Sequence, residues 1–189
     1  MRSRWAKVLV FGLCLTPLGL GWYEWNHDLI PNPVAFLQHF TGDWAIRLIV
    51  VTLAVTPVRQ VLRLPDLIRF RRMVGLFAFF YACLHFTTYL WLDKDFDVVE
   101  MLKDVGKRPF ITVGFAALVL MVPLAVTSTA GWIRRLGGKR WQRLHRLIYL
   151  SGILAVVHYY WLVKSDVRLP VLYGSLVGLL LVYRIKVHR

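Results

Sequence analysis

Six long apolar stretches, separated by short polar segments, dominate this chain of 189 residues. A helix needs about 20 mainly apolar residues to cross the hydrocarbon core of a bilayer. The stretches cover residues 8–23, 44–62, 73–92, 110–128, 146–163 and 170–183. Because the segments between them are too short for a separate domain, we predict an all-α integral membrane protein. It is expected to be a six-helix transmembrane bundle that forms one domain over residues 1–189.

The composition agrees with a lipid environment. Apolar residues make up 58% of the chain and charged residues 18%, whereas soluble domains are nearer half and a quarter. The net charge of +14 could indicate nucleic-acid binding, but the basic residues flank the apolar stretches rather than line one face. No nucleic-acid partner is therefore expected. Cys14 and Cys83 lie inside apolar stretches without a CxxC spacing, so neither a disulfide framework nor a cysteine metal site is predicted.

The first apolar stretch resembles a secretory signal peptide, because Arg2, Arg4 and Lys7 precede it. No small-x-small cleavage site follows, and residues 22–25 read Trp-Tyr-Glu-Trp, which is typical of an interfacial aromatic anchor. We therefore expect this stretch to be retained as the first membrane helix.

The connections between the stretches alternate in charge. Seventeen of the 24 lysines and arginines lie in four segments or at the ends of the stretches that border them: before the first stretch, between the second and third, between the fourth and fifth, and after the last. Nine of the ten acidic residues lie in the other connections, and Asp66 is the exception. Cytoplasmic loops are enriched in lysine and arginine. Both termini are therefore predicted to lie in the cytoplasm.

Two histidines lie deep within this pattern. His85 is 13 residues from Arg72 at the inner edge, and His158 is 13 residues from His145, so each lies about 20 Å into the membrane. A weak repeat relates the two regions, since Leu-Ala-Val-Thr at residues 53–56 recurs at residues 124–127. Ionisable residues at such depth are costly and commonly functional. A shared ligand is favoured over two separate hydrogen bonds to backbone carbonyls.

Haem is the ligand that this pattern favours, held between the third and fifth spans. Small residues precede both histidines at helical spacing, which leaves room for a macrocycle, although tight helix packing would also use small residues. Two histidines fill both axial positions of a haem iron that carries electrons. The small residues are Gly75, Ala78 and Ala82 before His85, and Ser151 and Ala155 before His158.

The remaining histidines have weaker claims to a function. His145 lies at the inner start of the fifth span, about 140° around the helix from His158, so it cannot share the first haem. It is either a ligand of a second, inner haem or a polar residue at the headgroups. His27, His39 and His188 lie in an outer loop and the tail, where histidines are usually only solvated.

Several segments resemble the ferric reductase-like transmembrane domain family, and within it the haem-binding subunits of bacterial protein-methionine-sulfoxide reductase systems. These segments are residues 71–76, 84–85, 131–137, 141–149 and 158–159. The resemblance implies haem b, held by His85, His145 and His158, and FMN. Eukaryotic relatives carry four haem histidines and a cytosolic flavin domain. This chain has three candidate histidines, so the number of haems, one or two, remains open. It has no nucleotide-binding motif, so an external electron source is required.

The function implied by the resemblance is electron transfer across a bacterial inner membrane. Electrons would pass from the quinone pool or a cytoplasmic flavin reductase to a periplasmic molybdopterin protein-methionine-sulfoxide reductase (MsrP), which repairs oxidised proteins. The chain would then be the electron-transfer subunit rather than the catalytic subunit.

The inner loops supply candidates for a flavin, quinone or haem-propionate site. Arginines pair bidentately with phosphates and carboxylates, and tryptophans offer flat surfaces. The alternative is that these arginines only obey the positive-inside pattern. The candidates are Arg71, Arg72, Arg134, Arg135 and Trp141.

Two other functions fit parts of the pattern. A free-standing cytochrome b could reduce ferric iron or another acceptor directly. A cofactor-free transporter could use the histidines for protons or metals, but no Asp or Glu lies within the six stretches, which weighs against it.

Overall fold

The computed structural model describes residues 2–27 and 30–187, so Asp28, His188 and Arg189 lie outside the described residues. Within the described part every regular element is helical, as the hydropathy pattern predicts. The helices are α1 (Arg2–Asn26), α2 (Pro33–Val61), η1 (Pro65–Leu67), α3 (Ile68–Leu92), α4 (Val98–Lys107), α5 (Pro109–Val126), α6 (Ala130–Leu136), α7 (Gly138–Leu144), α8 (Leu147–Leu162) and α9 (Arg168–Val187).

Proline and capping residues mark several helix starts. Pro33 and Pro109 lie in the first turns of α2 and α5, where a missing backbone N–H costs no helical hydrogen bond. The Asn32 side chain accepts a hydrogen bond from the backbone N–H of Ala35, and Asp97 caps α4 in the same way. Such caps satisfy otherwise unpaired N–H groups, so local chemistry explains where these helices begin.

Five helices are long and apolar enough to cross a membrane. They cover Arg4–Asn26, Pro33–Val61, Pro65–Leu92, Pro109–Val126 and Arg168–Lys186. The predicted span over residues 146–163 corresponds to α8, which has 16 residues and is about 24 Å long at 1.5 Å per residue. The prediction of a membrane helical bundle is thus confirmed, and five of the six predicted spans correspond to helices with the length and composition of a membrane span.

Helix α2 begins eleven residues before the predicted span, which started at residue 44. His39 and Asp43 therefore lie on a helix, and assigning His39 to a loop was wrong. The polar residues in this part of the chain lower the mean hydropathy of a long window, while the Asn32 cap and the apolar residues 34–37 favour helix. Asp43 also invalidates the argument that no acid lies on a membrane helix.

The short helices α4, α6 and α7 lie where only connections were expected. A window of about 20 residues cannot detect helices of seven to ten residues. α4 is strongly amphipathic, but it buries Met101 and Asp104 and leaves the apolar Val98 and Leu102 exposed.

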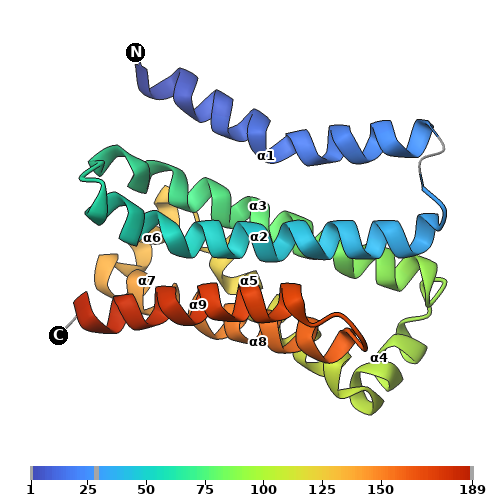
Figure 1. The fold of residues 1–189 in the computed structure, drawn as a ribbon. Coiled ribbons are helices and arrows are strands. Elements are labelled where there is room, and N and C mark those ends of the chain that lie inside the picture. The colour runs from blue at the N-terminus through green and yellow to red at the C-terminus, as the bar shows by residue number, and fades with distance from the viewer. Residues whose placement is uncertain (1, 28–29, 188–189) are drawn as a thin grey trace.

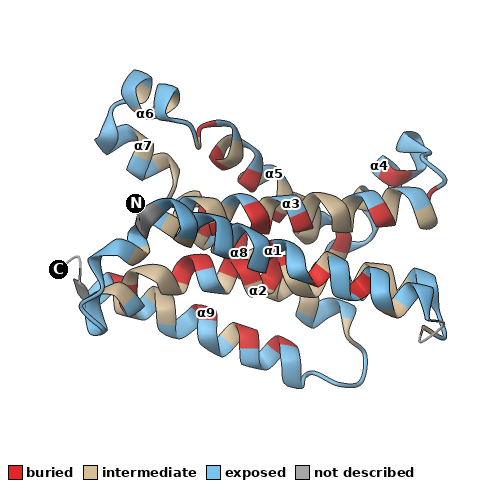
Figure 2. Ribbon diagram, turned by 90° about the horizontal axis from the view of Figure 1, so that it is seen from above, coloured by how far each residue is buried: buried red, intermediate tan, exposed pale blue. Residues whose placement is uncertain are grey.

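The central bundle consists of two closely packed helix pairs, α2 with α3 and α5 with α8, together with α9. Figure 1 shows α1 along the outside of this bundle. The Tyr81 hydroxyl of α3 connects the two parts by donating to the Cys14 carbonyl at 2.9 Å. Buried residues follow the inward faces of the central helices (Figure 2), and Leu53, Ala78 and Tyr81 are completely inaccessible.

The charged connections separate to opposite ends of the bundle. The start of α1, the α2–α3 connection, α6, α7 and the end of α9 lie at one end, and α4 lies at the other (Figure 1). The first group carries most of the basic residues, and the α4 region carries half of the acids. Large apolar side chains such as Leu13 and Leu179 are exposed on the outer surface, as expected for lipid-facing positions.

Candidate functional site

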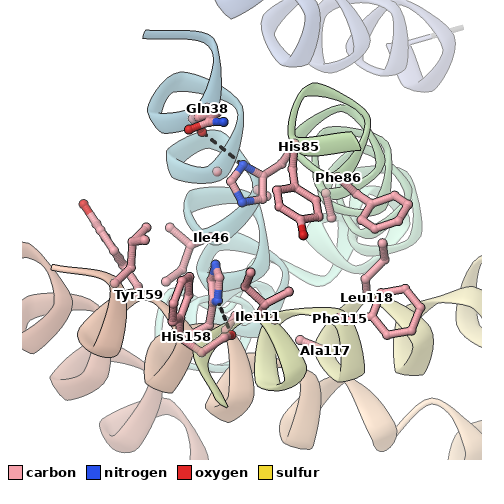
Figure 3. A pocket seen from close by; sticks show the side chains of 18 of the residues that line it. Gln38, Ile46, His85, Phe86, Ile111, Phe115, Ala117, Leu118, His158 and Tyr159 are labelled. Atoms are coloured by element: carbon pink, nitrogen blue, oxygen red, sulfur yellow. Dashed lines mark hydrogen bonds between the residues drawn. The ribbon is translucent and has the colours of Figure 1, made fainter. Parts of the chain in front are cut away.

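His85 of α3 and His158 of α8 face each other in the interior of the bundle. Their ring centroids are 6.1 Å apart and the ring planes make an angle of 71°. Figure 3 shows the two imidazoles approaching from different helices, with α2 beside them. The structure therefore brings together the two histidines that were predicted to share a depth, although they are 73 positions apart in the chain.

Both imidazoles are oriented by a backbone carbonyl of a neighbouring helix. The Nδ1–H of His85 donates to the Gln38 carbonyl at 3.0 Å, and the Nδ1–H of His158 donates to the Phe110 carbonyl at 2.7 Å. A carbonyl oxygen can only accept, so Nδ1 carries the proton in each ring. The Nε2 lone pairs are then available for a metal, and metal-binding histidines commonly have this outer hydrogen bond.

Two glycines allow the histidines to come this close to their neighbours. A Cβ atom added at Gly42 of α2 would lie 3.1 Å from the His85 ring, and one added at Gly114 of α5 would lie 2.6 Å from Nδ1 of His158. Real Cβ atoms essentially never approach as closely as 2.6 Å. Gly114 in particular is therefore required for the position of His158.

These contacts reveal an internal repeat. Gln38, Gly42 and His85 in the α2–α3 pair correspond to Phe110, Gly114 and His158 in the α5–α8 pair, at offsets of 72, 72 and 73 residues. Sequence reasoning found the histidines of this repeat and missed the glycines. The same offset connects Gly42 with Gly114 and could have identified them.

The histidine rings line a cavity of about 370 Å³, which we call the outer cavity. This volume is within the usual range for organic ligands. Ala82 and Ala155 line it as predicted, but Gly75 lines a different cavity. Ala78 and Ser151 are fully buried, and the Ser151 hydroxyl donates to the Ala117 carbonyl at 2.9 Å. These two small residues serve helix packing instead.

Two facing imidazoles suit one metal whose other positions are filled by a cofactor. Metal–imidazole bonds are about 2 Å long, so two rings on opposite sides of one metal have nitrogens roughly 4 Å apart and centroids somewhat farther. The observed 6.1 Å agrees. No group of three or more His, Cys, Asp or Glu residues that could hold a bare ion occurs in the described part of the chain. A macrocycle would supply the missing donors.

An ion-pair network joins α4 to the outer mouth of this cavity. Lys94 contacts Asp104 at 2.8 Å and Glu100 at 2.9 Å. Asp104 also contacts Arg108 at 3.3 Å, and Arg108 and Tyr89 line the cavity. The hydrogen bond from Lys94 lowers the pKa of Asp104, and the hydrogen bond to Asp104 raises the pKa of Lys94. Both groups are therefore charged near neutral pH.

His145 lies apart from the histidine pair, in a second cavity of about 490 Å³ that we call the inner cavity. It follows the last residue of α7 and lies two residues before α8, so the prediction that it begins the fifth helix was wrong. Trp141 stacks on its ring with centroids 3.8 Å apart. The Thr127 hydroxyl donates to the Pro123 carbonyl, so its oxygen accepts from Nε2 of His145 at 3.1 Å.

The predicted arginine cluster is divided by the fold. Arg71, Arg72 and Trp141 line the inner cavity with His145. Arg134 and Arg135 do not line it, because they lie exposed on α6. Among the described residues that line the inner cavity, His145 is the only histidine. Sequence reasoning missed Arg184 of α9, which is buried in this cavity's wall.

Comparison with known proteins agrees with this architecture. Residues 41–156 match the family described as "Ferric reductase like transmembrane component". The chain belongs to this family. A relative from Herminiimonas arsenicoxydans is 53% identical over 182 residues, which cover 95% of this chain and 84% of the relative. Relatives from Xanthomonas campestris pv. campestris and Xanthomonas axonopodis pv. citri are 51% and 50% identical over 187 residues, covering 95% of this chain and 85% of each relative.

All three relatives are named "Protein-methionine-sulfoxide reductase heme-binding subunit MsrQ". No solved structure matches the chain. In this ferric reductase-like chain, the family match contains His85 and His145 and ends two residues before His158. The match also includes Gly42 and Gly114, so it spans both halves of the repeat that holds the histidine pair.

Proposed function

We propose that this chain is the haem b-carrying electron-transfer subunit of a bacterial protein-methionine-sulfoxide reductase system. The observation that carries the proposal is the facing pair His85 and His158, each with Nδ1 bonded to a carbonyl and with no hydrogen bond at Nε2 among the described residues. The names of relatives that are about 50% identical support the assignment to this system. The unit would be residues 1–189, with both termini on the cytoplasmic side of the inner membrane.

The residues of the outer cavity fit a haem. His85 and His158 would be its axial ligands, and the carbonyls of Gln38 and Phe110 would hold their rings in position. Haem would supply a one-electron carrier whose two axial positions are both filled. The protein's own contribution is to fix the two imidazoles, to surround them with apolar side chains and to exclude water from the bundle interior.

The two ends of the bundle would have different partners. The α4 end would face the periplasm and a molybdopterin methionine-sulfoxide reductase, MsrP, as electron acceptor. The basic end would receive electrons from the quinone pool or from a cytoplasmic flavin reductase, with FMN as a candidate cofactor. The inner cavity supports this assignment of the donor side, because His145, Trp141, Arg71 and Arg72 line it between the outer cavity and the basic end.

The optical spectrum of the purified full-length protein tests the proposal. A Soret band that sharpens on dithionite reduction is expected, and its absence would refute haem binding. His85→Ala and His158→Ala should each lower the haem content about tenfold or more, because each removes an axial ligand. His27→Ala is the matched control, since His27 directly follows α1 and its Nδ1 forms a hydrogen bond with the Tyr23 carbonyl of that helix. Full low-spin spectra in both ligand variants would contradict the pairing.

A further inference from the structure

Helix α4 does not use its most apolar side to pack against the bundle. Its buried residues are Met101 and Asp104. Three large apolar residues, which we call the apolar side of α4, are exposed in the described structure: Val98 at 52%, Val99 at 63% and Leu102 at 56%. Single exposed apolar side chains are ordinary on a protein surface. Three on one side of a ten-residue helix form a patch.

The remaining residues of α4 divide the helix into distinct sides. At 3.6 residues per turn, the three residues of the apolar side lie within an arc of about 100°. The charged side consists of Glu100, Lys103 and Lys107, which lie within an arc of about 60° on the far side of the helix. The buried residues lie between the two. A helix with one strongly apolar and one charged side is typical of helices that lie in the plane of a membrane surface.

The position of α4 fits such a surface. It lies beside the bundle, at the level of the end of α1 and the start of α2 rather than beyond them, and it runs obliquely to the long helices (Figure 1). Exposed tryptophans occur near the ends of α1, α3 and α8 at this end of the bundle: Trp25, Trp91 and Trp161. Tryptophan is enriched at membrane–water interfaces. These side chains therefore indicate that α4 lies at the depth of the lipid headgroups.

A tight turn directs the chain from α3 into α4. Asp95 and Phe96 have φ angles of 45° and 61°, in the left-handed region that bulky residues rarely adopt. The backbone N–H of Phe96 donates to the Leu90 carbonyl at 2.9 Å, so the turn is closed onto the end of α3. The Phe96 side chain is itself exposed. An unusual backbone conformation of this kind persists only where the surrounding structure maintains it.

Polar contacts fix the rotation of α4 about its own axis. Asp104 contacts Lys94 at 2.8 Å and Arg108 at 3.3 Å, and it accepts a hydrogen bond from the Tyr89 hydroxyl at 3.1 Å. A buried carboxylate needs such partners. Because they hold the Asp104 side of the helix against the bundle, the apolar side must face the surroundings of the protein.

We propose that α4 is an interfacial helix whose apolar side lies in the lipid leaflet at the α4 end of the bundle, with its charged side in water. Helices of this kind insert their apolar face about 5–10 Å into the boundary between headgroups and acyl chains. Lipid is a better occupant than a protein partner, because α4 directly connects the membrane helices α3 and α5 and lies beside the bundle. The proposal does not depend on haem binding.

Membrane contact of α4 would also act on the outer cavity. Tyr89 and Arg108 line that cavity and are partners of Asp104. Lipid on one side of α4 and these contacts on another would together hold the helix in place at the cavity mouth.

Spin labels on the full-length chain in lipid nanodiscs test the proposal. Cys14 and Cys83 are first replaced by alanine, and one cysteine at a time is then introduced and labelled. Power saturation compares collisions with oxygen, which concentrates among acyl chains, and with a water-soluble nickel chelate. The variants are Val99→Cys and Leu102→Cys on the apolar side, Lys103→Cys and Lys107→Cys on the charged side, and Leu179→Cys and Asp166→Cys as the lipid and water references.

The ratio of oxygen to nickel collisions should be several-fold higher on the apolar side than on the charged side, and close to that of Leu179→Cys. The proposal is overturned if labels on the apolar side give the ratio of Asp166→Cys, because this side then lies in water. Low collision rates with both reagents at Val99→Cys and Leu102→Cys would also overturn it, because they would show that protein covers this side.

A second measurement keeps the native cysteines, in case their replacement prevents folding. Leu102→Ser should lower the Tm of unfolding in nanodiscs by roughly 2–4 °C, because it removes an apolar side chain from the lipid boundary. Lys103→Ser is the matched control, since leucine and lysine have similar helix propensities and the two positions are adjacent in α4. It should change Tm less. Equal changes in the two variants would contradict the lipid contact.

Discussion

The outer and inner cavities are both lined by residues of the two repeated helix pairs, α2 with α3 and α5 with α8. The side chains that the two pairs contribute to each cavity differ in chemistry. In the outer cavity the two halves contribute matched groups, a histidine beside a glycine and a carbonyl in each. At the inner cavity the halves differ: Thr127, which follows α5, accepts from His145, whereas the corresponding Thr56 of α2 contacts Arg71. One half presents an imidazole and the other a guanidinium.

This difference indicates how one repeated unit can serve two roles. A matched pair of imidazoles suits a metal with two equal axial ligands. An imidazole opposite arginines does not provide such a matched pair of ligands. The charged groups differ too: ion pairs lie at the outer mouth, whereas among the described residues that line the inner cavity every charged side chain is an arginine.

The largest change in haem content is expected from substitutions of Gly114 and Gly42, the two glycines beside the histidines of the outer cavity. Gly114→Ala should lower the haem content about tenfold, because the new Cβ would lie 2.6 Å from Nδ1 of His158 and displace an oriented ligand. Gly42→Ala should have a smaller effect, since its contact is 3.1 Å. Haem per protein, measured by the pyridine haemochrome method, checks both.

Gly75→Ala is the matched control for these variants. Gly75 lies in the same bundle, but a Cβ there meets Thr52 at an ordinary 3.4 Å. Equal haem contents in Gly114→Ala and Gly75→Ala would show that the close approach of α5 to His158 is unimportant for the site.

The next effect concerns the inner cavity. His145→Ala should leave the low-spin spectrum of the outer haem intact, because His145 lies outside the outer cavity. The rate of reduction by a donor acting at the basic end should fall several-fold. Stopped-flow absorbance at the Soret band measures this rate. If the variant loses as much haem as His85→Ala, the separation of the two cavities is wrong.

A smaller effect is expected between the cavities, where Ser151 packs α8 against α5. Ser151→Ala removes a buried hydrogen bond to the Ala117 carbonyl, which should cost about 1 kcal/mol and lower Tm by roughly 2–4 °C. The spectrum should not change. Thr87→Ala is the control, because its hydroxyl bonds a carbonyl of its own helix on the exposed surface. If Ser151→Ala and Thr87→Ala change Tm equally, the hydrogen bond between α8 and α5 contributes no more to stability than one within a single helix.

The smallest effect is a pH dependence confined to the outer end. The pKa of Asp104 is lowered by its hydrogen bond from Lys94. Its contribution to stability is therefore complete above the ordinary carboxyl pKa and is lost as pH falls through the lowered folded-state pKa. Tm should fall on acidification below about pH 4, and this fall should be smaller in Asp104→Asn.

Asp166→Asn is the control for this titration. Asp166 is exposed, and its contact with Arg168 is long, at 3.8 Å. It should titrate like the unmodified protein. If Tm depends on pH identically in the unmodified protein and in both variants, the Lys94–Asp104 pair does not stabilise the outer end.

The sequence predicted the histidine pair because depth can be counted along a helix. His85 and His158 are each 13 residues from an inner-edge position, and that spacing does not depend on how the helices pack. The glycines were missed because their role depends on the neighbouring helix. Contact between Gly114 and His158 exists only after α5 and α8 pack.

The arginines illustrate the same limit. The charge pattern located the basic end, but it could not show which side chains turn inward. Arg134 and Arg135 lie exposed on α6, a helix too short for a hydropathy window. Arg184 lies buried at the end of α9 and was counted only as part of a basic tail.

The most direct test of the account is a high-resolution electron cryomicroscopy structure of the haem-loaded chain. The account predicts a macrocycle in the outer cavity, with Nε2 of His85 and Nε2 of His158 on opposite sides of one iron and both Nδ1 atoms still bonded to carbonyls. A macrocycle bound elsewhere in the bundle, or one that lacks either histidine as a ligand, would contradict it.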